Sequence, residues 1–287
     1  MKILVIPDIH GKFEDAFSVI NEHKDHVDKV VVLGDYVDGY EQGLDNDSLV
    51  NDFWMLCEMA RKEPDKFCLC LGNHDMSYIS SGRDAIYCSR HHGDMTNYYR
   101  EMFRDNLDIL NVVYLIDGCL FSHAGVTMDF YKRVVGQFSK LNSKKRLSPD
   151  NERKWESLNV NPFNPETLNF IMHYDFNSRK NGISYFDLMG DDVYGNSDDA
   201  SCVWVRPWTL GYAKDWPPQI KCQVVGHTKV GLNYYQVGNN RFIITDSEEG
   251  NKYLLLDTST TESLPWRIVT SLIDGPTEWL HILLRFE

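Results

Sequence analysis

One local pattern recurs along the chain: a short apolar run ends in a turn that carries Asp, Asn or His. The clearest case is residues 30–38, where four apolar residues precede Gly34 and the carboxylates of Asp35 and Asp38. A continuous apolar run bounded by glycine is typical of a strand covered on both faces. A carboxylate at the end of such a strand is costly unless it is paired or binds a metal. The fold must therefore bring partners to these acids.

Four further junctions supply candidate partners. Their apolar runs are followed by Asp8 and His10, by Asn73 and His74, by His123, and by His227. Apolar residues at helical spacing over 13–20 and 49–60 separate strands predicted at 2–7, 29–34 and 67–71. This alternation predicts parallel strands with right-handed crossovers, a sheet type that binds ligands at the carboxyl ends of its strands. The polar residues are therefore expected to meet in one site.

The side chains of these junctions form a plausible ligand set for metal ions. Carboxylate, amide and imidazole ligands suit manganese, iron or zinc better than calcium. A carboxylate shared by two ions, here Asp35, holds them roughly 3.5–4 Å apart, and such a pair lowers the pKa of bound water towards about 7.

The rest of the chain yields coarser expectations. A buried helical stripe is predicted within 76–110, a hairpin over 112–122, and closing strands at 222–226, 241–245 and 253–257. The predicted stripe consists of Tyr98, Tyr99, Met102 and Phe103. Residues 127–200 are polar and interrupted by Pro149, Pro162 and Pro165. We interpret 127–200 as an insertion or lid over the site, within a single catalytic domain of residues 1–287.

Composition excludes several classes of protein. The net charge of −13 disfavours general nucleic-acid binding, because phosphate backbones are repelled. Seven scattered cysteines, an odd number, favour a reduced cytoplasmic chain. The first apolar run is too short for a signal peptide, and no run reaches the length of a membrane span. We therefore expect a cytoplasmic protein without a membrane partner.

The five junctions together form a family pattern. The chain resembles the calcineurin-like metallophosphoesterases, and within them the phosphoprotein phosphatase family. The His-Ala-Gly and Gly-His-Thr forms are closest to bacterial-type serine/threonine protein phosphatases and symmetrical diadenosine tetraphosphatases. Alone, an Asp-x-His pair is usually a surface turn, and Gly-Asn-His is a possible helix cap. The matching segments occur in family order at residues 7–11, 34–38, 72–75, 123–125 and 226–228.

The resemblance implies a fold, cofactors and a mechanism. The fold would be an α/β four-layer α-β-β-α sandwich with a polar insertion. Two divalent ions, most favourably Mn²⁺ with Fe or Zn as alternatives, would support direct attack of a metal-bridging hydroxide on a phosphate ester. His74 would protonate the leaving alkoxide, oriented by Asp38. We expect the Asp38 carboxylate to raise the pKa of His74 and fix its tautomer, which suits a general acid near neutral pH. The implied ligands are Asp8, His10 and Asp35 for the first ion, and Asp35, Asn73, His123 and His227 for the second.

The chain departs from the family where phosphate is bound. The usual arginine after the second Asp of the Gly-Asp-x-x-Asp segment is replaced by Gly39. Arg206 matches the position of a second phosphate-binding arginine in bacterial members, so we expect it to be the main guanidinium clamp. Arg83, soon after the Asn73–His74 turn, is the second candidate for substrate binding.

Four functions are compatible with these features. The first is a serine/threonine or dual-specificity protein phosphatase acting on phosphorylated protein. The second is a diadenosine tetraphosphatase or another small-nucleotide phosphohydrolase, because the missing arginine and the polar insertion allow a different pocket. A binding module that has lost catalysis is disfavoured because no ligand is missing. A nuclease is disfavoured by the acidic charge and by Lys229, where many nuclease relatives carry a second histidine.

Overall fold

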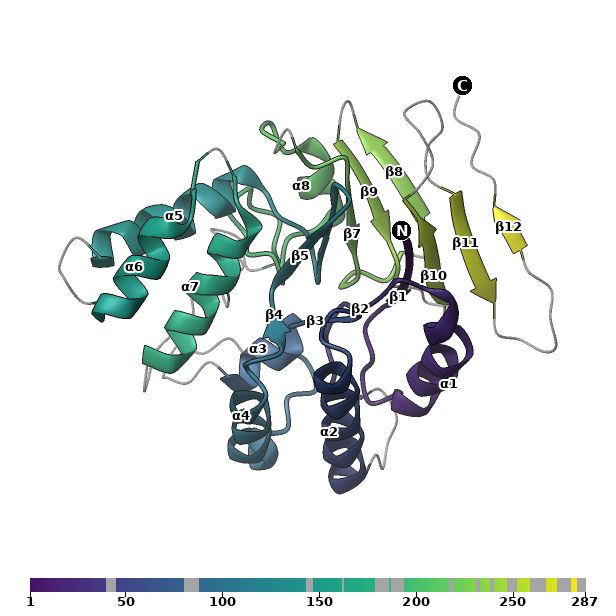
Figure 1. Ribbon diagram of the computed structural model, residues 1–287. Coiled ribbons are helices and arrows are strands. Elements are labelled where there is room, and N and C mark those ends of the chain that lie inside the picture. The colour runs from purple at the N-terminus through teal and green to yellow at the C-terminus, as the bar shows by residue number, and fades with distance from the viewer. Residues whose placement is uncertain are drawn as a thin grey trace.

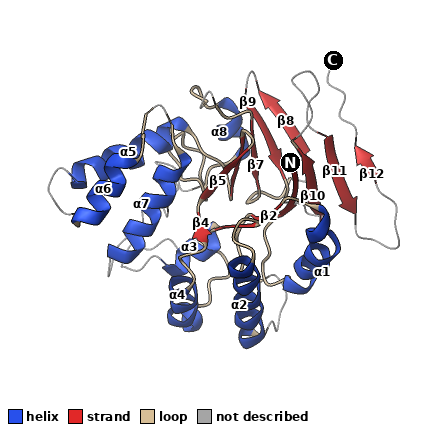
Figure 2. Cartoon of the chain, viewed as in Figure 1, coloured by secondary structure: helices blue, strands red, loops and turns tan. Residues whose placement is uncertain are grey.

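Two β-sheets form the centre of the protein, with helices on their outer sides (Figure 1). The structure is a computed structural model. It describes residues 1–39, 45–79, 88–142, 147–161, 163–178, 186, 194–216, 219–230, 233–237, 240–246, 252–258, 267–272 and 280–282. Figure 2 shows the strands between the helices of the two flanks.

The first sheet has seven strands in the order β12-β11-β10-β1-β2-β3-β4. Its strands β1 to β4 run parallel, as predicted for the first three, whereas β10 pairs antiparallel with β1. The bounds are β1 Lys2–Ile6, β2 Lys29–Val32, β3 Phe67–Cys70, β4 Leu110–Asn111, β10 Lys252–Asp257, β11 Arg267–Leu272 and β12 Leu280–Ile282. Helices α1 (Phe13–His23) and α2 (Asn46–Lys62) connect the first three strands, and a short 3-10 turn η1 (Lys24–His26) follows α1. The predicted strand–helix alternation is confirmed.

The second sheet has five strands in the order β5-β6-β7-β9-β8. Strands β5 and β6 form the predicted hairpin, and its turn residues Asp117 and Gly118 adopt φ of 50° and 83°. Strands β6, β7 and β9 are parallel neighbours. The bounds are β5 Val113–Ile116, β6 Cys119–Ser122, β7 Cys222–Val225, β8 Asn233–Val237 and β9 Asn240–Ile244.

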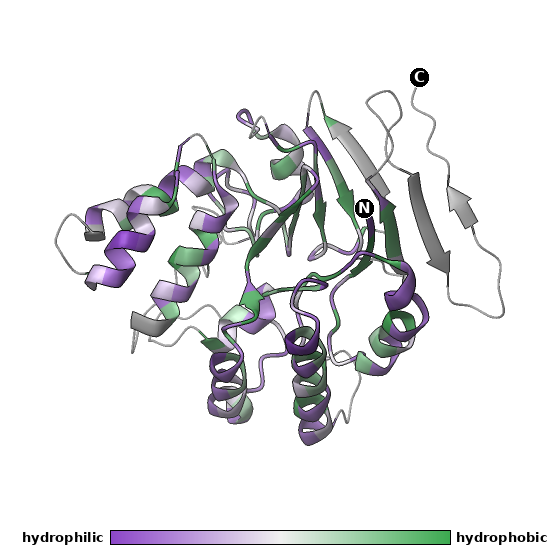
Figure 3. Ribbon diagram, in the orientation of Figure 1, coloured by the Kyte–Doolittle hydropathy of each residue, from purple (hydrophilic) through white to green (hydrophobic). Residues whose placement is uncertain are grey.

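The core is divided by the alternation of side chains along each strand. In β1, Ile3 and Val5 belong to a buried cluster shared with Phe121 and Val224 of the second sheet. Leu4 and Ile6 point the other way, into the cluster that contains the apolar faces of α1 and α2. Because both faces are covered, β1, β2 and β3 are apolar apart from Lys2 and Lys29 at the start of the first two strands (Figure 3).

The outer face of the second sheet is covered by α8 (Pro207–Tyr212). Leu210 of this helix packs on Val225, Phe242 and Ile244. The order of layers is therefore helix, sheet, sheet, helix. The fold expected from the resemblance is confirmed.

Helices α3 (Asn73–Ile79) and α4 (Thr96–Asp105) pack together after β3, with a 3-10 turn η2 (Gly93–Met95) before α4. Tyr99, Met102 and Phe103 are buried as predicted. The prediction for Tyr98 is wrong, because its side chain is 46% exposed. Tyr99, Met102 and Phe103 lie at i, i+3 and i+4 on one face of α4, whereas Tyr98 lies at the edge of that face.

The described part of 127–200 contains three helices: α5 (Met128–Asn142), α6 (Pro149–Ser157) and α7 (Pro165–Ser178). Two of the prolines begin helices, where a missing N–H costs no hydrogen bond. Pro162 lies outside the described residues. Helix α7 packs on β4 and β5, where Asn169 Oδ1 accepts hydrogen bonds from the backbone of Val112 and Val113. A lid function of this segment stays a prediction.

Within the described ranges, we find no helix with the length and apolarity needed to cross a membrane.

Candidate metal centre

Five loops that each follow a strand converge on one site. The loops after β1, β2 and β3 come from the first sheet, and those after β6 and β7 come from the second. The structure brings together the predicted residues Asp8, His10, Asp35, Asp38, Asn73, His74, His123 and His227. Arg83 lies outside the described residues.

Backbone hydrogen bonds fix the first two loops to each other. The backbone N–H of Ile9 donates to Gly34 O at 3.3 Å, and that of His10 donates to Asp35 O at 2.6 Å. Asp75 holds the third loop, because its carboxylate accepts from the backbone N–H of Asp35, Tyr36 and Gly72 at 2.8–2.9 Å. Sequence reasoning gave Asp75 no role, although it closes the matched segment 72–75.

The backbone is strained where the ligands sit. Six described non-glycine residues have positive φ, and four of them are predicted site residues: His10 at 46°, Asp35 at 51°, Asp38 at 58° and His227 at 66°. Such conformations are uncommon outside glycine and asparagine-type turns, and they persist only where the surroundings impose them. The surrounding structure therefore holds these residues in an unfavourable backbone conformation that directs their side chains into the site.

Two glycines leave room for the carboxylates. A Cβ on Gly72 would overlap Asp35 Oδ1, and a Cβ on Gly226 would overlap Asp8 Oδ1. Each glycine belongs to a loop different from that of the carboxylate it faces. The site therefore needs these loops to approach at backbone distance.

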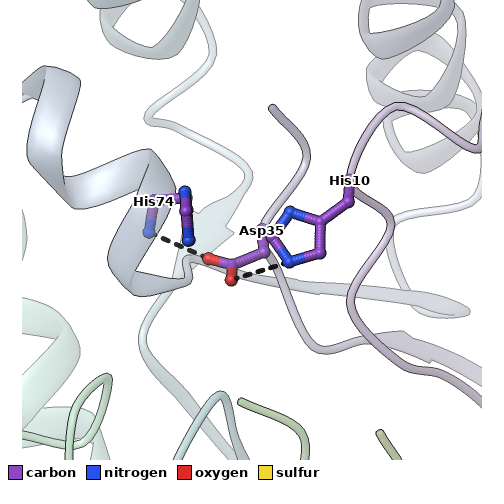
Figure 4. Close-up of side chains that lie close together, drawn as sticks. All are labelled: His10, Asp35 and His74. Atoms are coloured by element: carbon purple, nitrogen blue, oxygen red, sulfur yellow. Dashed lines mark hydrogen bonds and ion pairs between the residues drawn. The ribbon is translucent and has the colours of Figure 1, made fainter. Parts of the chain in front are cut away.

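Asp35 lies at the middle of the site (Figure 4). Its Oδ2 is 3.5 Å from Nε2 of His10 and 3.5 Å from Nε2 of His123. Its Oδ1 accepts a hydrogen bond from the backbone N–H of His74 at 2.9 Å. Two sets of ligand atoms each lie within 4.8 Å of one another, Asp8–Asp35–His123 and His10–Asp35–His74, and Asp35 is common to both.

The second sheet adds two imidazoles around Asn73. The Oδ1 of Asn73 lies 2.8 Å from His123 Nε2 and 3.0 Å from His227 Nδ1. Asp8 joins the sheets, because its carboxylate accepts from the backbone N–H of His227 at 3.0 and 3.2 Å.

Asp38 and His74 form a hydrogen-bonded pair beside this cluster. Asp38 Oδ2 lies 2.7 Å from His74 Nδ1, and Asp38 Oδ1 accepts from the Tyr78 hydroxyl. Burial raises the pKa of Asp38 to about 6. The predicted increase at His74 is wrong in this structure: burial first, then the charge of Arg90, lowers the pKa of His74 to about 3. Withdrawal from water outweighs the favourable carboxylate.

The comparisons with known proteins agree with this geometry. Residues 1–230 match the model of the calcineurin-like phosphoesterase family. The chain belongs to this family. A search of curated protein sequences gave no significant match.

Solved structures of similar fold are also phosphoesterases by name. A cold-active protein-tyrosine phosphatase from a psychrophilic Shewanella species is 18% identical, with a TM-score of 0.56 over 97% of this chain and 80% of that one. A second structure of a cold-active protein tyrosine phosphatase, also 18% identical, gives 0.52 over 97% and 78%. A serine/threonine phosphatase from Saccharomyces cerevisiae is 14% identical, with a TM-score of 0.45 over 97% and 82%. The first two likenesses support the fold.

A calcineurin-like phosphoesterase is a phosphoric ester hydrolase that depends on two metal ions, and the residues present fit such ions. The Nδ1 of His10 is 3.1 Å from Val37 O, and the Nδ1 of His123 is 2.9 Å from Leu33 O. Donation from Nδ1 leaves Nε2 of each neutral ring as an acceptor, facing the carboxylate of Asp35. Hydrogen-bond acceptors that face one another in this way are stabilised by a cation bound between them.

The pKa shifts in the calcineurin-like site also favour the binding of metal ions. Burial raises the pKa of Asp8, and the negative charge of Asp246 raises it further. Burial lowers the pKa of His10 and His227, so the rings are held neutral, as metal ligation requires. Sequence reasoning missed Asp246, although it follows the apolar run of β9 in the same strand-then-acid pattern as Asp35.

Two arginines adjoin the calcineurin-like centre. Arg206 is partly buried; its Nη1 donates to Thr228 Oγ1 at 3.2 Å and its Nε to Tyr194 O at 2.8 Å. Arg90, which no sequence motif singled out, donates from Nε to Asp38 O at 3.0 Å. The arginine predicted as a clamp therefore lies next to the His227 loop, and a second guanidinium lies next to the Asp38 loop.

Proposed function

We propose that this protein is a dinuclear metal-dependent phosphomonoesterase that acts on phosphorylated serine or threonine in proteins, with tyrosine as a further substrate. The observation that carries the proposal is the convergence of Asp8, His10, Asp35 and His123 with Asn73 and His227, beside the hydrogen-bonded Asp38–His74 pair. Family membership supports the reaction class. The choice of a protein substrate rests on the motif forms of the sequence.

The proposed ligands are those expected from the resemblance. Asp8, His10 and Asp35 would hold one ion, and Asp35, Asn73, His123 and His227 would hold the other. The central position of Asp35, common to both sets of converging atoms, supports a shared carboxylate. When bound, the ions would supply an activated water and neutralise phosphate oxygens, with Mn²⁺ favoured and Fe or Zn as alternatives.

Side chains of this protein would transfer the proton and bind the phosphate. His74 would deliver a proton to the leaving alkoxide, for which the negative charge of the bound phosphate must offset the burial that lowers the pKa of His74. Asp38 would hold the imidazole in the required orientation. Asp38 has one oxygen on His74 and the other on Tyr78, so its carboxylate cannot rotate without breaking a hydrogen bond. Arg206 would bind phosphate oxygens through its guanidinium.

The test is hydrolysis of p-nitrophenyl phosphate by purified protein freed of metal and reloaded with manganese, iron, nickel or zinc. We expect manganese to restore the highest rate, and Asp35→Asn, which disrupts both proposed ion sites, serves as the blank. Wild-type protein that is inactive with all four metals would contradict the proposal.

A substrate panel then resolves the class of substrate. Rates on a phosphoserine or phosphothreonine peptide, a phosphotyrosine peptide and diadenosine tetraphosphate are compared under the best metal condition. A higher kcat/KM for the phosphopeptides supports the protein phosphatase. A clear preference for the dinucleotide would replace it with a small-nucleotide phosphohydrolase.

A further inference from the structure

A short turn outside every recognised motif docks onto the centre at two points. Cys88 is buried, and its Sγ lies 3.1 Å from Asn73 Nδ2 and 3.2 Å from Asn73 O. Two residues later, Arg90 Nε donates to the carbonyl of Asp38 at 3.0 Å, across 52 positions of sequence. The turn therefore touches one proposed metal ligand, Asn73, and the loop that carries Asp38.

The conformation of this turn directs Arg90 towards the centre. Arg90 has φ of 64° and is the only positive-φ residue, among those that the structure describes, that adjoins the centre without belonging to a motif. A long, charged side chain in the left-handed region is uncommon and requires external restraint. The contacts of Cys88 and of Arg90 Nε supply that restraint, so the guanidinium is held beside the site rather than extended into solvent.

Arg90 and Arg206 adjoin different parts of the centre. After burial, the charge of Arg90 is the next largest cause of the lowered pKa of His74, and it also lowers the pKa of His10. The charge of Arg206 instead contributes, after burial, to lowering the pKa of His123 and His227. Their hydrogen bonds, from Arg90 to Asp38 O and from Arg206 to Thr228 Oγ1, place the two guanidiniums next to different loops of the centre.

The centre is rich in negative charge, which disfavours the approach of a phosphate dianion. The charges of Asp35 and Asp246 act on Asp8, and those of Asp38 and Asp246 act on Asp35. Position 39, next to Asp38, is glycine and offers no charge. Arginine is the residue best suited to grip phosphate oxygens, because its planar fork matches them bidentately.

We propose that Arg90 binds the substrate phosphate together with Arg206, and so supplies from the 88–90 turn the guanidinium that is absent after Asp38. This assignment rests on the proposed phosphoesterase function and adds a substrate-binding residue to it. Arg90 would act on the side of His74, where the leaving group is protonated, and Arg206 on the side of His227.

The test measures binding of inorganic phosphate, without turnover, to manganese-loaded protein by calorimetry. We expect Arg90→Ala to weaken phosphate binding about 10- to 100-fold, the range for a lost charge-assisted pair. Arg90→Lys keeps the charge but not the fork, so it should fall between Arg90→Ala and wild type. Arg104→Ala, an exposed arginine on α4, is the matched control and should bind as wild type does.

Metal content and KM separate this role from a purely structural one. Manganese per chain should be the same in Arg90→Ala and wild type, and KM for p-nitrophenyl phosphate should rise in parallel with the phosphate dissociation constant. Unchanged phosphate affinity in Arg90→Ala overturns the proposal, as does a loss of bound manganese that accounts for the weaker binding.

Failure of this assignment is distinguishable from failure of the proposed function. If wild type binds phosphate and hydrolyses esters while Arg90→Ala binds phosphate equally well, only the role of Arg90 is wrong. If wild type neither binds phosphate nor hydrolyses any ester, the proposed function fails and the assignment fails with it.

Discussion

The two sheets contribute unequally to the centre. The first sheet supplies Asp8, Asp35 and Asp38, and its third loop adds the Asn73 amide and the His74 imidazole, all within 67 positions (8 to 74, inclusive) of the sequence. The second sheet supplies two imidazoles from loops 104 positions apart (227 minus 123), which a hydrogen bond from Gly226 N to His123 O brings together at 2.7 Å.

The two sheets therefore contribute different kinds of side chain to the centre, which we call a division of roles. Most of the charge and the proton-transfer pair come from the first sheet, whose loops are tied by backbone hydrogen bonds and by Asp75. The second sheet mainly completes the ligand set with neutral rings. Substitutions in the first-sheet loops are therefore expected to be the more damaging.

The largest contrast is expected between Asp35→Asn and His227→Asn. Asp35 belongs to both sets of converging atoms, whereas His227 is proposed to serve one ion. Asp35→Asn should reduce activity to the level of metal-free protein and leave less than one ion per chain. His227→Asn should retain about one ion with residual activity, because the other proposed ligands stay in place. Elemental analysis gives the metal content, and equal losses in the two variants would contradict the division.

A second prediction sharpens the role of the Asp38–His74 pair. His74→Asn and Asp38→Asn should each lower kcat about 10²- to 10⁴-fold, the range for lost general acid catalysis, with little change in metal content. The loss should be larger on phenyl phosphate than on p-nitrophenyl phosphate, because the nitrophenolate leaves without a proton. A loss of equal size on both substrates would indicate that the pair acts in another way.

The third prediction compares a glycine that lets two loops of the first sheet meet, Gly72, with one that lets loops of the two sheets meet, Gly226. Gly72→Ala should displace Asp35, and Gly226→Ala should displace Asp8, which weakens metal binding about 10- to 100-fold, as for other groups that orient ligands. Metal titration followed by activity measures the effect. Gly136→Ala on α5 is the control: a Cβ there meets no atom within 4 Å, and it should stabilise the helix slightly. Gly72→Ala with wild-type metal affinity would contradict the close approach.

The smallest expected effect is on stability against pH in the presence of a chelator. Asp38 has a folded-state pKa of about 6, above its unfolded value, so its contribution is fully present below the unfolded pKa and is lost as pH rises through 6. The difference in free energy of unfolding between wild type and Asp38→Asn should therefore shift by about 1 kcal/mol against wild type from about pH 5 to pH 7. Urea unfolding at both pH values measures it, and a shift of the opposite sign would contradict the raised pKa.

Local pattern was enough to predict the framework. The parallel strands β1 to β3, the hairpin at Asp117–Gly118 and the strands β7, β9 and β10 were predicted because apolar period and turn residues are short-range signals. The helices of 127–200 were not, because their prolines were interpreted as interruptions, whereas Pro149 and Pro165 begin helices. Strands β4, β8, β11 and β12 were also missed, and two of these have only two or three residues.

By itself, the sequence determined which residues converge on the metal centre, because a polar residue that directly follows a buried parallel strand is carried to the same edge as its counterparts. Only the tertiary structure decided what surrounds them. Burial depends on contacts from the whole fold, so it lowered the pKa of His74 where the neighbouring Asp38 alone predicted an increase. Arg90 follows no strand and reaches Asp38 across 52 positions, so its place beside the centre is set by packing that no local pattern encodes.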